Sequence, residues 1–241
     1  MKKTLLALAV AAALVPSLAM AEAGDIVVRL RATHIAPDES SKLGSQTNAS
    51  YPDLLGTPGA TTLYNNSAAT LGVDGNTIPE IDFSYYITKN IAAELILAVG
   101  TRHDVHINGL NANSAVTQSA LGSVNLLPPT LTLQWHFNPD QTIDPYIGAG
   151  VSYVRAMDNG LTAQTTLGPQ PIRISRNSFG PAIQAGVDYN IPDTKWLINA
   201  DVKKIWFSTD VELNVANGGW KKIDSLDVDP WVVSVGFGRK F

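Results

Sequence analysis

The residues of this sequence that are best suited to do chemistry are charged residues that alternate with apolar ones. Five of them are Arg29, Arg31, Glu80, Asp82 and Glu94. Opposite charges that meet in a closed interior form ion pairs, because pairing relieves the cost of removing each charge from water. We therefore expect these five residues to form a plug that fills the interior of the protein, as the inside of a small barrel must be filled.

Catalytic and metal-binding arrangements are much weaker. His103 and His106 flank Asp104, but the sequence places no further ligand beside them. Ser152 and His136 fall on the inward faces of two adjacent predicted strands and would suit a nucleophile and its base. No acidic residue is evident to orient the histidine. The chain has no cysteine, which excludes a thiolate. We expect no enzymatic activity, no cofactor and no metal site.

The start of the chain predicts export. Lys2 and Lys3 precede a short apolar run at 5–14, and a small-residue cleavage pattern ends at Ala21. We expect a signal peptide over residues 1–21 and one domain over residues 22–241. The apolar run is too short to span a bilayer, and no later run reaches 18 apolar residues, so a spanning helix is excluded. The formal net charge of −4 argues against a nucleic-acid partner.

Alternating hydrophobicity must position the charged residues, because side chains point to opposite faces of a strand in turn. It predicts eight strands, near 26–35, 78–87, 91–100, 131–137, 145–155, 179–189, 196–203 and 231–241. The long connections are at about 36–77, 103–126, 156–177 and 208–226, and the short ones at 88–90, 138–144 and 190–194. Outer-membrane barrels have this asymmetry of short periplasmic turns and long external loops. We predict an all-β fold, an eight-stranded antiparallel transmembrane β-barrel.

The last strand indicates which face meets lipid. Trp231 to Phe241 covers ten steps of roughly 3.3 Å, and a tilt of about 40° reduces this length to roughly 25 Å, the height of a barrel's apolar band. A soluble barrel that buries the same apolar face is the alternative. The interface aromatics that we expect at the ends of strands include Tyr85, Trp135, Phe137, Tyr146, Tyr153, Trp196, Trp231 and Phe241.

Several stretches resemble the OmpW/AlkL family of bacterial outer-membrane proteins, in matching order. They are "AGDIVVRL", "FSYYITKNIAAELILAV", "LPPTLTLQWHF", "PYIGAGVSY", "FGPAIQAGVDYNI", "WLINADV" and "DPWVVSVGFGRKF". The resemblance implies a barrel in the outer membrane of a Gram-negative bacterium that helps small hydrophobic molecules to cross, with outer-membrane lipid around it. It also implies that the barrel-assembly machinery recognises the terminal Phe241. The sequence departs from the family pattern at Lys203 and Lys204, which make the upper lumen less apolar.

Two groups of residues could serve such transport. Pro128 and Pro129 donate no backbone N–H, so they could leave a gap in the wall through which a solute escapes sideways, or they could merely begin a strand beside a loop. The apolar residues Leu126, Leu127, Met157, Trp206 and Phe207 could form a funnel for an apolar solute, or could only pack the loops. The alternative function is a closed structural or surface-interaction barrel, contacted by phage, bacteriocin or host, that transports nothing. The oligomeric state is not evident.

Overall fold

The computed structural model describes residues 22–241 apart from 46–67, 99–100, 111–113, 167 and 216–218. The signal peptide expected at residues 1–21 lies outside the described residues. Among the described residues no helix is long and apolar enough to cross a membrane.

Eight strands form a closed antiparallel wall. They are β1 (Ile26–Ala36), β3 (Asn76–Tyr86), β4 (Ile91–Ala98), β7 (Thr130–His136), β8 (Ile143–Asp158), β11 (Asn177–Asn190), β12 (Trp196–Ile205) and β15 (Trp231–Lys240). Each strand pairs with the next one in this order, and β15 pairs with β1 to close the ring. The predicted eight-stranded antiparallel barrel is confirmed. Closure matters because it leaves no strand edge with unpaired backbone groups.

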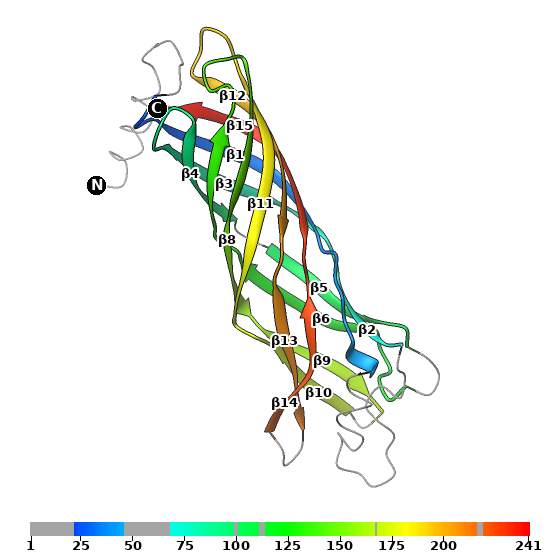
Figure 1. Ribbon diagram of the computed structural model, residues 1–241. Coiled ribbons are helices and arrows are strands. Elements are labelled where there is room, and N and C mark those ends of the chain that lie inside the picture. The colour runs from blue at the N-terminus through cyan, green and yellow to red at the C-terminus, as the bar shows by residue number, and fades with distance from the viewer. Residues whose placement is uncertain (1–21, 46–67, 99–100, 111–113, 167, 216–218) are drawn as a thin grey trace, which may run out of the picture.

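The two ends of the barrel differ. Short turns join β3 to β4, β7 to β8 and β11 to β12 at one end, which we call the turn end, and the C-terminus lies there (Figure 1). The opposite, extended end carries β2 (Thr70–Val73), β5 (Thr101–Asn108), β6 (Ala120–Leu127), β9 (Gly160–Thr165), β10 (Gly168–Ile174), β13 (Ser208–Val215) and β14 (Gly219–Asp227). The long connections therefore contain strands of their own, because their residues also alternate.

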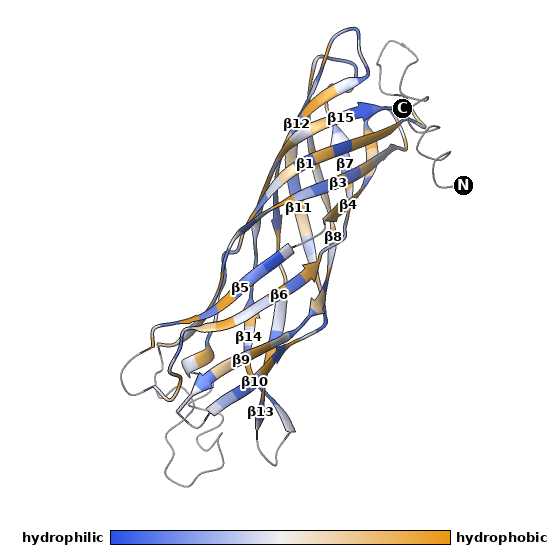
Figure 2. Cartoon of the chain, turned by 180° about the vertical axis from the view of Figure 1, so that it is seen from behind, coloured by the Kyte–Doolittle hydropathy of each residue, from blue (hydrophilic) through white to orange (hydrophobic). Residues whose placement is uncertain are grey.

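The wall has an apolar outside and a polar inside. Hydrophobic and hydrophilic residues follow one another along its strands (Figure 2). Leu133 and Val235 point outward and are 55% and 57% exposed, whereas Arg29, Asp82 and Glu94 are fully buried inside. Large apolar side chains that stay this exposed over a whole wall would be unfavourable in water, and they suit a wall that faces lipid. The predicted assignment of the faces agrees with this arrangement.

The interior is crowded at its glycines. A Cβ atom on Gly150 of β8 would lie 1.9 Å from the carbonyl oxygen of Leu131 on β7. On Gly186 of β11 it would lie 2.4 Å from the ring of Tyr146. Glycine is required at these positions because a neighbouring strand, or an aromatic ring that crosses the lumen, comes too close for any side chain.

Beyond the wall the polarity is reversed. The extended end has an apolar core of buried side chains from several strands, which include Leu71, Val105, Ile107, Leu121, Leu161, Ile172, Val211, Leu213 and Ile223. The extended end therefore folds like a soluble barrel, with its apolar side chains inside, on top of a wall that has them outside.

Candidate functional site

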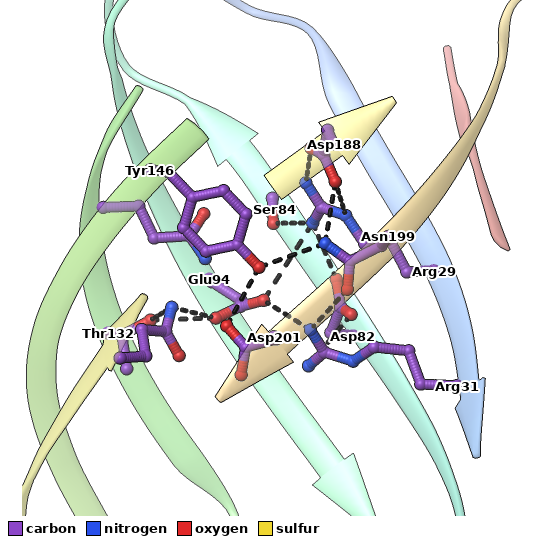
Figure 3. Close-up of polar contacts among 12 residues, drawn as sticks. Arg29, Arg31, Asp82, Ser84, Glu94, Thr132, Tyr146, Asp188, Asn199 and Asp201 are labelled. Atoms are coloured by element: carbon purple, nitrogen blue, oxygen red, sulfur yellow. Dashed lines mark hydrogen bonds and ion pairs between the residues drawn. The ribbon is translucent and has the colours of Figure 1, made fainter. Parts of the chain in front are cut away.

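A buried charged network, which we call the lumen cluster, lies inside the wall (Figure 3). Its centre is Arg29, whose guanidinium lies 2.6 Å from a carboxylate oxygen of Asp188 and 3.0 Å from one of Asp82. Arg29 also donates to the hydroxyl of Ser84 at 2.7 Å. Because the side chain is fully buried, each of these contacts replaces a hydrogen bond to water.

Arg31 occupies the next inward position of β1, closer to the extended end. Its guanidinium lies 2.6 Å from Glu80 and 3.1 Å from Asp82, and 3.6 Å from Glu94. It also donates to the amide oxygen of Asn199 at 3.3 Å. The five residues of the predicted plug thus all lie in one ion-paired group.

Strand register explains half of this geometry. On neighbouring strands Arg29 stands opposite Asp82 and Arg31 opposite Glu80, so the pairs form directly across the β1–β3 ladder. Glu94 reaches the group from β4, where it stands opposite Ser84. Residues two apart share one face, and that is why both arginines point into the lumen.

The far wall supplies the rest of the lumen cluster. Asp188 comes from β11, and Asn199 and Asp201 come from β12. Asn199 donates to Asp188 at 2.8 Å and to the Tyr146 hydroxyl at 3.1 Å, and that hydroxyl donates to Asp201 at 2.9 Å. Lys203 lies 3.3 Å from Asp201. The inward parity of these residues was the available signal, but nothing in the sequence told which of them meet across the lumen.

The prediction that Tyr146 is an interface aromatic is wrong. Tyr146 is 1% exposed and lies inside the lumen, because it has the inward parity of β8 and its hydroxyl finds a buried carboxylate. The interface aromatics Trp135, Phe137, Trp231 and Phe241 lie on the outer face, with 47% to 51% of each residue exposed.

A smaller polar group lies at the turn end of the lumen. His136 Nδ1 lies 2.7 Å from Asp144, and its Nε2 lies 3.2 Å from the amide oxygen of Gln134. Candidate ligand atoms of His136, Asp144 and Asp188 all lie within 4.8 Å of one another, a spacing that would suit a metal ion. Asp188 is already held by two guanidinium nitrogens of Arg29, so we assign these residues to the polar filling of the lumen.

Neither of the other chemical groupings considered from the sequence comes together. Ser152 bonds to Thr130 at 3.0 Å and stands six residues along β8 from Tyr146, the residue opposite His136. His103 points inward and contacts the carbonyl oxygen of Asp74 at 2.8 Å, while Asp104 is exposed. The acidic partner of His136 is Asp144, whereas Ser152 bonds to Thr130.

Two apolar cavities lie above the lumen cluster, toward the extended end. The first has a volume of about 60 Å³, and the lumen cluster contributes only Glu80 and Lys203 to its lining. The rest of its lining includes Ile35, Ile96, Ala98, Leu126, Pro128, Val154, Ile205, Phe207 and Val232. The second has a volume of about 40 Å³ and continues outward between Leu71, Val105, Val124, Leu161, Ile174, Val211 and Leu226.

The predicted funnel residues divide into two groups. Leu126 and Phe207 line both cavities. Met157 and Trp206 are 59% and 38% exposed and line neither, and Leu127 is half-buried and lines neither. The structure therefore brings two of the five residues to the cavities, because only these two have the inward parity at their level.

Two ladders of the wall end beside the first cavity. The β4–β7 ladder ends at the pair Ile96–Thr130, and the β5–β6 ladder begins at the pair Thr101–Leu126. Between these two pairs the described residues form no β-pairing across the two strands. We call the described part of this interval, residues 97–98 and 127–129, the wall break.

Pro128 and Pro129 lie in the wall break. Neither has an N–H group to donate, which removes two donors from this part of the ladder. The carbonyl of Pro129 accepts from the amide of Tyr153 on β8 at 2.9 Å, so that side of the strand remains anchored. Pro128 lines the first cavity.

Known proteins match this chain over most of its length. A model of the OmpW family matches residues 22–241. Outer membrane protein W of Escherichia coli strain K12 is 32% identical over 242 residues, which cover 100% of this chain and 99% of that protein. Outer membrane protein AlkL of Ectopseudomonas oleovorans is 27% identical over 173 residues, or 72% of this chain and 70% of that protein. The crystal structure of the outer membrane protein OprG from Pseudomonas aeruginosa matches with a TM-score of 0.71 and 26% identity, covering 93% of this chain and 99% of that one.

Proposed function

Because this chain belongs to the OmpW family of outer-membrane barrel proteins, we propose that it is a passive channel for small hydrophobic molecules that releases them sideways into the bilayer. The protein lies in the outer membrane of a Gram-negative bacterium, as its relatives do. Its turn end faces the periplasm and its extended end faces outward.

The first support for this route is the position of the lumen cluster, which lies between the cavities and the turn end. An apolar solute that moved straight through would have to separate Arg29 and Arg31 from their carboxylates, and breaking a buried pair costs about 3–5 kcal/mol. The ion pairs of the lumen cluster therefore act as a plug in this proposal. A route toward the periplasm is unfavourable, and an apolar route must leave above the plug.

The wall break is the observation that carries the proposal. It stands at the level of the first cavity, and Pro128 and Ala98, one from each side of it, line that cavity. Opening the wall at this point sacrifices few backbone hydrogen bonds, because Pro128 and Pro129 have no N–H group to donate across it. On the outside, lipid tails would receive the solute directly.

A reversible crosslink tests the route. Extending the β4–β7 register by two residues puts Ala98 opposite Pro128, so Ala98→Cys with Pro128→Cys would staple the wall break. The chain has no other cysteine to compete. We expect oxidation to stop uptake of a labelled alkane or fatty alcohol into liposomes, and reduction to restore it.

The matched control is Ile96→Cys with Thr130→Cys. These two residues also line the first cavity, but they are already paired in the ladder. This crosslink puts the same disulfide in the cavity and leaves the wall break free. Equal inhibition by both crosslinks, or by neither, would refute lateral release.

One observation favours the alternative of a closed structural or surface-interaction barrel. The first cavity, at about 60 Å³, is smaller than the roughly 150 Å³ that accommodates benzene in an engineered cavity. Lining side chains must therefore move before a solute enters. Liposomes that contain the folded protein and take up no hydrophobic solute faster than empty ones would establish this alternative.

A further inference from the structure

Three exposed arginines lie just beyond the apolar band, and we call them the rim arginines. Arg102 and Arg155 are on the outer face of their strands. Arg155 is on β8, two residues beyond the outward-facing Tyr153. Arg176 adjoins it, since the carbonyl of Arg176 accepts from the amide of Ala156 at 2.8 Å. Arg102 is on β5, opposite Asn125 of β6.

The rim arginines make no ion pair with any described residue, unlike cations in other parts of the extended end. Arg173 lies 2.5 Å from Glu212, and Lys222 lies 2.6 Å from Asp210. Long cationic side chains without a protein partner are available to an anion from outside.

The length of β8 gives the height of Arg155 relative to the apolar band. From Ile143 to Tyr153 the outward side chains of β8 cover ten steps, or about 33 Å, which a tilt of about 40° reduces to roughly 25 Å. Arg155 comes one outward position later, about 5 Å above the apolar band. The rings of Tyr153 and Phe179 stack at 4.8 Å directly below and mark the interface. Arg155 therefore lies at the level of lipid headgroups.

The rim arginines also lie side by side across the sheet. Arg155 stands opposite Leu127 of β6 and Arg102 opposite Asn125, two residues along the same strand. Two strand spacings and two residues separate their Cα atoms by about 12 Å. The nearest acidic residues on these strands are Asp104 and Asp158, which both come after the arginines in the outward direction. The charge that faces the membrane is therefore positive.

We propose that the rim arginines bind the phosphates of lipid A, the glycolipid of the outer leaflet. A guanidinium binds a phosphate through two parallel hydrogen bonds, and a lipid held at the interface brings its phosphates to the height of Arg155. The acyl chains then lie on the apolar face below, next to Leu131 and Val151. The lipid-binding surface is present whether or not the barrel transports anything.

The experiment uses protein refolded into phosphatidylcholine nanodiscs and bisphosphorylated lipid A as the probe. We expect Arg102→Gln with Arg155→Gln to weaken binding of lipid A, measured by native mass spectrometry, on the order of 10-fold or more. Arg173→Gln with Lys222→Gln removes the same charge farther out, and we expect no change. Dephosphorylated lipid A should bind the wild type as weakly as lipid A binds the rim variant.

Three results would overturn the proposal. An equal loss in both variants would indicate only the net charge of the extended end. Equal binding of the dephosphorylated lipid would assign the affinity to the acyl chains. Displacement of lipid A by millimolar inorganic phosphate would identify a site for the free anion. Arg102 and Arg155 are exposed, and Arg173 and Lys222 are half-buried. The folding of each variant is monitored by the far-ultraviolet circular dichroism of the barrel.

Discussion

Replacing Arg29 with leucine should destabilise the folded barrel strongly. The substitution removes two hydrogen bonds to Asp188, one to Asp82 and one to Ser84. It leaves Asp188 with the amide of Asn199 at 2.8 Å, and leaves Asp82 with Arg31 at 3.1 Å. Two buried carboxylates thus lose their main partner, and we expect a loss of about 3–5 kcal/mol in the free energy of unfolding.

The measurement is urea unfolding of the protein in lipid vesicles, followed by tryptophan fluorescence. Arg29→Lys is the graded variant: it keeps the charge but cannot form the forked contact with Asp188, so we expect a smaller loss than for leucine. Arg155→Leu is the control, because that arginine is exposed and unpaired at the interface, where its removal should change stability by about 0–1 kcal/mol. A loss below about 1 kcal/mol for Arg29→Leu would mean that water solvates the lumen cluster. The proposal that the lumen cluster acts as a plug would then have to be abandoned.

Two further predictions concern the wall. Gly150→Val should prevent folding or cost several kcal/mol, because even its Cβ would overlap the carbonyl oxygen of Leu131. Ala149→Val, on the outward face, should be tolerated. The yield of folded protein after refolding distinguishes the two variants, and equal yields would contradict the packing. A spin label at Leu133 should be reached by oxygen dissolved in lipid and not by a water-soluble relaxant, while a label at Thr132 should be shielded from lipid; a water-exposed Leu133 would disprove the orientation of the wall.

The strands and the inside–outside assignment were predictable because both depend on period-two alternation within short segments. Arg29, Glu94 and Asp188 were all placed on the inward face by parity alone. Their mutual contacts were not predictable, because Arg29 and Asp188 are 159 residues apart and meet only after the ring closes with a particular stagger. Tyr146 was misassigned because its aromatic type and its place near a strand end outweighed its inward parity, although a buried carboxylate satisfies its hydroxyl.

The extended end was harder to predict because the strands continue while their polarity reverses. On β8 the inward residues change from Gly150 and Ser152 to Val154 and Ala156, and the outward ones change from Tyr153 to Arg155. A prediction that looks for apolar residues on the outward face ends each strand at this reversal. The residues beyond it are then predicted to be loops.

The reversal has a physical consequence for the proposed route. A solute inside the extended end touches apolar walls, and one step deeper it meets ion-paired groups that offer it no favourable contact. Outside, the order is opposite, since apolar lipid lies at the depth where the lumen becomes polar. The free energy of an apolar molecule therefore falls most steeply in the sideways direction at the level of the reversal. Pro128, which has no N–H group to donate across the wall break, lines the cavity at this level.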